Sequence, residues 1–301
     1  STNNLIRKIQ LGKVTTLAGL NEKMDSFGQP KGGFADGEQT KARFNGPRYA
    51  SVSETGSIYI SDTDSNLIRK ITDGVVRTIT GAGKAGYLDG PQKEALFNRP
   101  SGLVVDLYDN VYVADSLNHV IRIVTPNGYV ATFAGKKTEN GGYKDGSTTE
   151  AEFNEPSDLA FDSEGALYVL DSGNQMVRKI FKGKVTTVFG ARSKLIEGTN
   201  YMTGALQNGY GADARLNFAK GIFISENDTI FIADTWNHVI RAITKSGKMI
   251  TVAGTGTAGN ASGSLSESRF NGPADLVLID STLYVSDMWN NMIRAIPVDL
   301  S

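Results

Sequence analysis

The stretch that decides the fold is YVADSLNHVIR at Tyr112–Arg122, in which an alternating apolar run ends in Asp115 and a β-branched run containing Arg122 follows. Related phrases occur five times, at intervals of about fifty to sixty residues. Short alternating runs predict β-strands, and their regular return predicts a repeat protein. The alternating runs are Ile58–Asp62, Val111–Asp115, Leu167–Asp171, Ile230–Asp234 and Leu283–Asp287, and the arginines that follow them are Arg69, Arg122, Arg178, Arg241 and Arg294.

Each copy opens with a Phe-Asn-x-Pro phrase about a dozen residues before the alternating run, and most copies close with a final strand such as Lys184–Gly190. Four short strands per unit with almost no helical periodicity predict an all-β propeller of antiparallel four-stranded blades. The fourth copy departs from the pattern because it has Leu216 in place of the Phe and Ala219 in place of the Pro. The openings are Phe44–Pro47, Phe97–Pro100, Phe153–Pro156, Leu216–Ala219 and Phe270–Pro273.

The phrase at Tyr112–Arg122 resembles the NHL repeat, and the resemblance covers essentially the whole chain. It implies a propeller, usually of six blades, in a family that includes RNA-binding and protein-binding modules, carbohydrate-associated bacterial envelope proteins and a few enzymes such as the amidating lyase. The strands found here make five near-complete repeats plus an N-terminal half repeat at Leu5–Gly19. Either Lys13–Ala18 closes the last blade, giving five blades, or the chain lacks residues of a sixth.

Composition limits the function classes. The 301 residues carry a net charge of −1, so no global field would gather nucleic acid or anionic lipid. The chain has no cysteine and no apolar stretch long enough to span a membrane. We expect one propeller domain over residues 1–301, monomeric and secreted or in a bacterial cell envelope. The sequence begins inside a strand-like segment at Asn3–Arg7, which is consistent with the removal of an upstream targeting segment or domain.

The charged residues that recur in every unit are interpreted as bracing and not as catalytic groups. An Asp at a strand end accepts hydrogen bonds from the following turn, and an Arg on the neighbouring strand pairs with it in a bidentate way. His119 and His238 occupy the same repeat position and are interpreted as repeat residues. With two histidines and no cysteine, a His-based metal site is not expected, which counts against the chemistry of the amidating lyase.

The positions that vary between repeats are where function is expected. Trp236 and Trp289, the only tryptophans, share a turn position in consecutive units, so we expect them to lie near each other. The long connection Gly190–Leu216, which carries Tyr201 and Tyr210, opens at the same end. Exposed aromatic side chains there predict a stacking platform for sugar rings or an extended peptide. The alternative is that each Trp covers its own turn.

The mouth of the channel is a second candidate site. Arg48, Asp158, Lys220 and Asp275 follow the opening phrase of their repeats, at the start of the innermost strands, and should line the axis. No cofactor is expected, although two converging carboxylates could hold calcium if enough further oxygens were present.

The leading hypothesis is a non-catalytic scaffold that binds a glycan or a protein partner on the Trp-bearing face. The alternatives are a metal-dependent lyase or lactonase, which rests on fold analogy, and an RNA-binding module, which would need a broad basic surface. The near-zero net charge argues against nucleic acid as the partner.

Overall fold

The structure is a computed structural model that describes residues 3–20, 24–26, 28 and 30–298. Its regular elements are β-strands and single-turn 3-10 helices, and the part of the chain described holds no helix long and apolar enough to cross a membrane. The chain divides into two compact units, Ser1–Phe133 and Ala134–Ser301, and each unit is described by itself.

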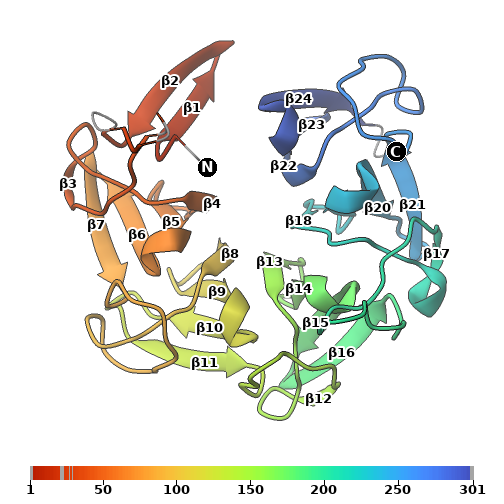
Figure 1. The fold of residues 1–301 in the computed structure, drawn as a ribbon, viewed down its shortest axis with the longest axis horizontal. Coiled ribbons are helices and arrows are strands. Elements are labelled where there is room, and N and C mark those ends of the chain that lie inside the picture. Colours follow the sequence, from red (N-terminus) through yellow and green to blue (C-terminus); the bar gives the residue numbers. More distant parts are fainter. Residues whose placement is uncertain (1–2, 21–23, 27, 29, 299–301) are drawn as a thin grey trace. The chain divides into compact units, whose positions relative to one another are not determined.

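The first unit contains three antiparallel sheets, each formed from consecutive strands (Figure 1). The N-terminal hairpin matches the predicted half repeat, and the other two sheets are complete blades. In sheet order they are β1 (Ile6–Gln10) with β2 (Lys13–Ala18); β3 (Gly37–Glu38), β7 (Val75–Thr80), β6 (Leu67–Thr72), β5 (Ile58–Asp62) and β4 (Pro47–Val52); and β11 (Val130–Ala134), β10 (Val120–Val124), β9 (Val111–Asp115) and β8 (Pro100–Val105).

The second unit also contains three antiparallel sheets, and the last of them has three strands. In sheet order they are β12 (Gly146–Ser147), β16 (Lys184–Phe189), β15 (Met176–Phe181), β14 (Leu167–Asp171) and β13 (Pro156–Phe161); β17 (Gly209–Tyr210), β21 (Lys248–Ala253), β20 (Val239–Ile243), β19 (Ile230–Asp234) and β18 (Gly221–Ile224); and β22 (Pro273–Ile279), β23 (Thr282–Asp287) and β24 (Met292–Pro297). The prediction of an all-β propeller with five near-complete repeats and a half repeat is confirmed. The two ways of closing the ring stay predictions.

Four of the five first strands begin at the Pro of the opening phrase, where the missing N–H donor and fixed φ suit a strand start. In the fourth repeat Ala219 replaces this Pro, and β18 begins two residues later at Gly221. Apolar side chains of neighbouring blades pack against each other in buried clusters. One cluster in the second unit contains Leu170, Val177 and Ile232.

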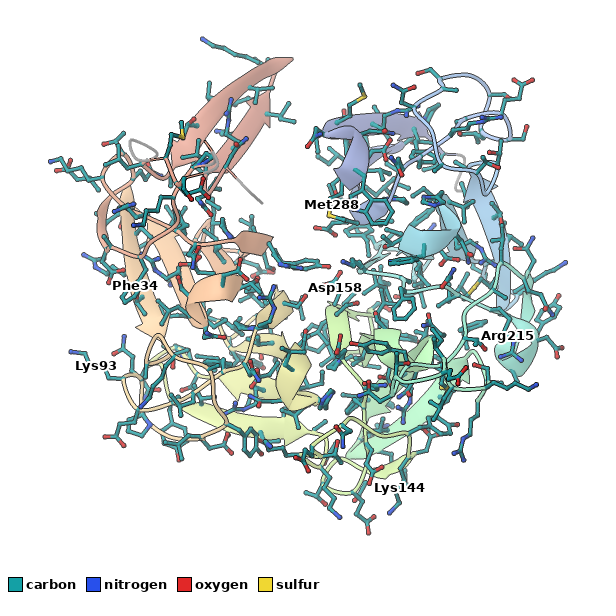
Figure 2. The ribbon with its side chains drawn as sticks, in the orientation of Figure 1. Phe34, Lys93, Lys144, Asp158, Arg215 and Met288 are labelled. Carbon is teal, nitrogen blue, oxygen red and sulfur yellow. The ribbon has the colours of Figure 1, made fainter. Side chains whose placement is uncertain are left out.

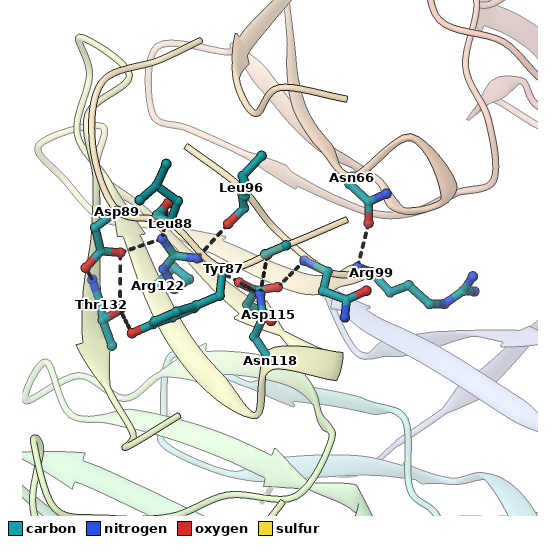
Figure 3. A network of polar contacts seen from close by, with 12 residues as sticks. Asn66, Tyr87, Leu88, Asp89, Leu96, Arg99, Asp115, Asn118, Arg122 and Thr132 are labelled. Carbon is teal, nitrogen blue, oxygen red and sulfur yellow. Dashed lines mark hydrogen bonds and ion pairs between the residues drawn. The ribbon is translucent and has the colours of Figure 1, made fainter. Parts of the chain in front are cut away.

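A buried arginine organises each complete blade. Figure 3 shows Arg122 on β10, whose Nη1 donates to Asp115 Oδ2 at the end of β9 at 2.8 Å and to the Leu96 carbonyl oxygen at 3.0 Å. Its Nη2 donates to Asp89 and to the Leu88 carbonyl oxygen in the connection before the blade. The guanidinium group therefore fastens two strands and the incoming loop together.

The same set of bonds is repeated in the other complete blades, and this confirms the bracing interpretation of the recurring Asp and Arg. The predicted bidentate pairing was wrong, because the two guanidinium nitrogens bind different partners. The strand-end partners of Arg69, Arg122, Arg178 and Arg241 are Asp62, Asp115, Asp171 and Asp234, and the loop partners are Asp36, Asp89, Asp145 and Asn208.

The Phe of the opening phrase lies against the same guanidinium group. Arg122 stacks on Phe97 with its guanidinium carbon 5.1 Å from the ring centroid, and Arg178 stacks on Phe153 at 5.1 Å. Such cation–π contacts with desolvated charge contribute about 2 kcal/mol each. The repeated Phe, Asp and Arg are thus three parts of one buried interaction.

We predict that Arg178→Met will destabilise the protein by about 3–5 kcal/mol, because the buried carboxylate of Asp171 would lose its cation. Urea denaturation followed by circular dichroism measures this. Arg77→Met is the matched control, since Arg77 is exposed on β7, and it should change the free energy of unfolding by less than about 0.5 kcal/mol. Equal effects of the two substitutions would contradict the bracing role.

Candidate functional site

Two tryptophans occupy the same turn in consecutive blades of the second unit. Trp236 lies in η5 (Thr235–Asn237) and Trp289 in η6 (Met288–Asn290), the 3-10 turns between the second and third strands. Their ring centroids are 6.1 Å apart with an interplanar angle of 80°. The two side chains are 55% and 43% exposed, so the predicted proximity is confirmed and much of each ring faces solvent.

Further rings lie beside this pair. Phe218 lies 5.7 Å from Trp236, and Tyr201 lies 5.4 Å from Phe218 in an edge-to-face arrangement. The His238 ring, which belongs to the same turn of the fourth blade as Trp236, is 5.9 Å from Trp289. We call these five side chains the aromatic row. Edge-to-face contacts within it stabilise the positions of the rings, so the row is held in place before any ligand arrives.

Tyr201 reaches the row from the long connection before the fourth blade. Its hydroxyl donates to Glu155 Oε1 at 2.6 Å, and this hydrogen bond raises the pKa of Tyr201 to about 12. The Met202 N–H donates to the Gly173 carbonyl oxygen at 2.8 Å, so the connection lies on the turn η3 (Ser172–Asn174) of the preceding blade. Glu155 places an acidic group at this end of the row.

Two residues of the row, Phe218 and His238, were not assigned to the site from the sequence, and Phe218 was not singled out at all. Phe218 occupies the third position of the opening phrase, where every repeat has a positive φ, and its own φ is 45°. Gly46 and Gly272 fill this position in two other repeats at little cost, whereas a bulky side chain there is strained by about 1–2 kcal/mol. The available signal was the departure of the fourth phrase, Leu216–Ala219, from the others.

His238 forms a hydrogen bond between neighbouring blades. It is a left-handed residue with φ of 55°, and its Nδ1 accepts a hydrogen bond from the Gly272 N–H at 3.2 Å. Asn66 makes the same bond to the N–H of Arg99 in the first unit at 2.8 Å. The interpretation of His238 as a repeat residue is therefore supported, and its Nε2 carries the hydrogen of the neutral ring.

The other aromatic candidate, Tyr210, does not join the row. It lies on β17, which pairs with the outermost long strand β21, and its ring is 6.0 Å from the Lys248 ammonium group. Trp236 lies instead at the turn between the two middle strands of that blade. Arg48 is exposed on β4 and belongs to the first unit.

The candidates at the channel mouth include a close pair of carboxylates. Asp158 on β13 and Asp275 on β22 lie in equivalent register positions on either side of Gly221, and Figure 2 labels Asp158. Asp158 Oδ2 accepts from the Ile222 N–H at 2.8 Å. Burial, followed by the charge of Asp275, raises the pKa of Asp158 well above its usual range, and burial raises the pKa of Asp275 to about 6. Lys220 adjoins Gly221, and its backbone N–H donates to the Ala233 carbonyl oxygen at 3.1 Å.

The carboxylate pair does not by itself suit a metal ion. Calcium takes six to eight oxygen ligands, and across the residues that the structure describes no three His, Cys, Asp or Glu side chains converge on one point. The hydrogen bond from Ile222 gives Asp158 a structural task, since β18 is the innermost strand of its blade and this N–H has no partner strand.

Comparison with known proteins identifies the repeat. Residues 153–180 match the model of the NHL repeat. NHL repeat-containing protein 2 of Bos taurus is 30% identical over 91% of this chain and 42% of that protein. The chain thus spans less than half of the length of this curated relative.

Solved structures share the fold at low sequence identity. An auxiliary nutrient binding protein from Bacteroides thetaiotaomicron has a TM-score of 0.56 and 17% identity, over 93% of this chain and 75% of that one. Virginiamycin B lyase from Staphylococcus aureus has a TM-score of 0.52 and 15% identity, over 99% of this chain and 79% of that one. Both a binding protein and an enzyme therefore use this architecture.

We predict that His238 contributes a loss of stability as the pH drops below about 6.5, because its ring must stay neutral to accept the bond from Gly272. Burial lowers the pKa of His238 below its ordinary value of 6.5, so in this range the unfolded chain binds a proton that the folded chain does not. Melting temperatures between about pH 8 and pH 5 measure the loss. His238→Asn, which copies Asn66, should reduce this pH dependence. A melting temperature that changes with pH as in the unchanged protein would contradict the role of the hydrogen bond between His238 and Gly272.

The carboxylate pair predicts the opposite dependence. With raised pKa values, Asp158 and Asp275 stabilise the fold fully below about pH 4; the contribution of Asp275 is lost as the pH rises through about 6, and that of Asp158 is lost as the pH rises through its own raised pKa. Asp275→Asn keeps an oxygen for the Leu276 N–H and removes the repulsion. It should therefore stabilise the protein by about 2 kcal/mol at pH 8 and by little at pH 4, as measured by urea denaturation. A constant difference across this range would refute the coupling of the two carboxylates.

Proposed function

Because this chain is an NHL-repeat β-propeller, we propose that it is a non-catalytic binding scaffold and that the aromatic row of its second unit holds a glycan. The observation that carries the proposal is the exposure of Trp236 and Trp289 at the same turn of adjacent blades, 6.1 Å apart. Monomeric proteins rarely expose large contiguous apolar patches, so neighbouring exposed aromatic rings on a rigid scaffold indicate a binding site.

The chemistry of the row suits sugars. Sugar rings present apolar C–H faces that stack on aromatic rings, together with hydroxyl groups that need donors and acceptors at the edges. The carboxylate of Glu155 beside Tyr201 is an acceptor, and the Nε2–H of His238 beside Trp289 is a donor. The row therefore combines ring faces with polar groups beside Tyr201 and beside Trp289.

The comparisons support a binding role at the level of the fold. A structure described as an auxiliary nutrient binding protein shares the architecture, and we extend a nutrient-binding role to this chain as part of the proposal. A scaffold of this kind would act outside the cell or in the cell envelope. A net charge of −1 favours a neutral ligand over nucleic acid.

A lyase-like or lactonase-like reaction is the second candidate. The observation that favours it is the carboxylate pair Asp158 and Asp275, because strongly raised pKa values gather at catalytic sites. It ranks second because both carboxylates accept hydrogen bonds from backbone N–H groups of the inner strands, which already accounts for their placement.

We predict that the double variant Trp236→Ala and Trp289→Ala loses glycan binding on an array while its free energy of unfolding changes by less than about 1 kcal/mol. Tyr108→Ala is the matched control, because Tyr108 is an 80% exposed aromatic residue in the first unit. It should bind like the unchanged protein.

Three outcomes separate the possibilities. Retained glycan binding by the folded double variant would move the site away from the row. A marked loss of stability would show that the tryptophans cover their turns. Capture of a protein but no glycan by the unchanged chain, lost in the double variant, would keep the site and replace the ligand class.

A further inference from the structure

We propose that the ligand is a single extended glycan chain that crosses three successive blades, with Tyr201 supplying the contact on the first of them. This inference rests on the proposed function and goes beyond it, because it assigns the length and form of the ligand. It also assigns a binding role to the connection that carries Tyr201.

The third blade has no aromatic residue at the turn that carries a tryptophan in the fourth and fifth blades. The middle residue of the 3-10 turn is Trp236 in the fourth blade and Trp289 in the fifth, but Gly173 in the third. A Cβ atom at Gly173 would lie 2.5 Å from the Asn154 side chain, so this turn has no room for a side chain of its own. The connection that carries Tyr201 binds to the Gly173 carbonyl oxygen instead.

Tyr201 brings a ring from the connection to the third blade. Its hydroxyl binds Glu155, which is the counterpart in the third blade of Phe218 in the fourth. Its ring contacts Phe218, which in turn contacts Trp236. The aromatic row therefore continues from the fifth blade through the fourth to the third, with Phe218 and Tyr201 half-buried, although the third blade contributes no aromatic residue at its own turn.

The connection is fixed at several points. Gln175 Nε2 donates to the Met202 carbonyl oxygen at 3.1 Å, and Asn154 Nδ2 donates to the Asn200 carbonyl oxygen at 2.6 Å. Both donors belong to the third blade, and the Met202 side chain is buried. Tyr201 is thus held on both sides along the chain, which lowers the entropy lost when a ligand stacks on it.

The angles between the rings decide the form of the ligand. Neighbouring rings along the row meet at 83°, 50° and 80°, so they do not make a flat shelf. A flat crystalline polysaccharide would touch such a surface at few points. A single soluble chain can turn between units and stack on one ring after another.

The charge beside Tyr201 limits the kinds of sugar that can bind at this end of the row. The carboxylate of Glu155 accepts the Tyr201 hydroxyl hydrogen, which places negative charge beside that ring. A uronic acid at this position would meet like charge, whereas a neutral or amino sugar would not. We therefore expect neutral or amino sugars at this end of the bound chain.

The test measures the affinity of the full chain for cello-oligosaccharides and malto-oligosaccharides, from the disaccharide to the hexasaccharide, by titration calorimetry. In the series that binds, the affinity should rise with the length of the oligosaccharide until the bound chain spans three blades. Tyr201→Ala should weaken binding of the hexasaccharide about tenfold and leave the disaccharide unchanged, which corresponds to the loss of one stacking contact. Tyr201→Phe, which keeps the ring, should retain most of the affinity, and Tyr108→Ala should change nothing.

The outcomes distinguish the two levels of inference. If Trp236→Ala abolishes binding but Tyr201→Ala leaves the hexasaccharide unaffected, or if affinity does not grow with length, the three-blade inference is wrong and the proposed function stands. If Trp236→Ala has no effect on binding, the proposed site is wrong. Failure of both series to bind, or preferential retention on crystalline cellulose, would overturn the extended soluble chain as the ligand.

Discussion

The buried arginine of each complete blade is the interaction on which the rest of the structure depends. A guanidinium group without exposed surface can persist only if its charge and its donors are satisfied. Here two carboxylates, or a carboxylate and an amide, and two backbone carbonyl groups do so, and in three of these blades an aromatic ring adds a cation–π contact. Its partners come from the middle strands, the opening phrase and the incoming connection. Each blade is therefore fastened at the points where a propeller made of short strands would otherwise fray.

This bracing leaves one position of each blade free to vary. The 3-10 turn begins directly after the strand-end Asp and ends at a left-handed residue, and the Asn before that residue donates to the same Asp, as Asn118 does to Asp115. The backbone N–H of the middle residue of the turn donates to the Asn carbonyl oxygen of the opening phrase, but its side chain takes no part in the bonds to the strand-end Asp. The middle residue is Asp64, Leu117, Gly173, Trp236 and Trp289 in the five repeats, so a binding surface can change without disturbing the blades.

Some of the strained and perturbed groups of the second unit belong to the two candidate sites. Glu155 and Phe218 have positive φ values that a Gly would adopt more easily, and both contribute to the aromatic row. Asp158 and Asp275 lie close enough for their charges to repel. Local strain of about 1–3 kcal/mol persists only where surrounding structure enforces it, and the braced blades provide that support.

The sequence by itself determined the blade, because the strand period, the turn residues and the Asp and Arg seven residues apart are local properties that return in every repeat. It also predicted that Trp236 and Trp289 would meet, since equal positions in adjacent blades lie side by side. Only the tertiary structure decided how Arg122 divides its bonds, because Asp89 and Asp115 approach it from opposite sides. The same holds for Tyr201, which reaches the row because its connection folds back onto Gly173, a contact between residues far apart in the chain that no repeat pattern records.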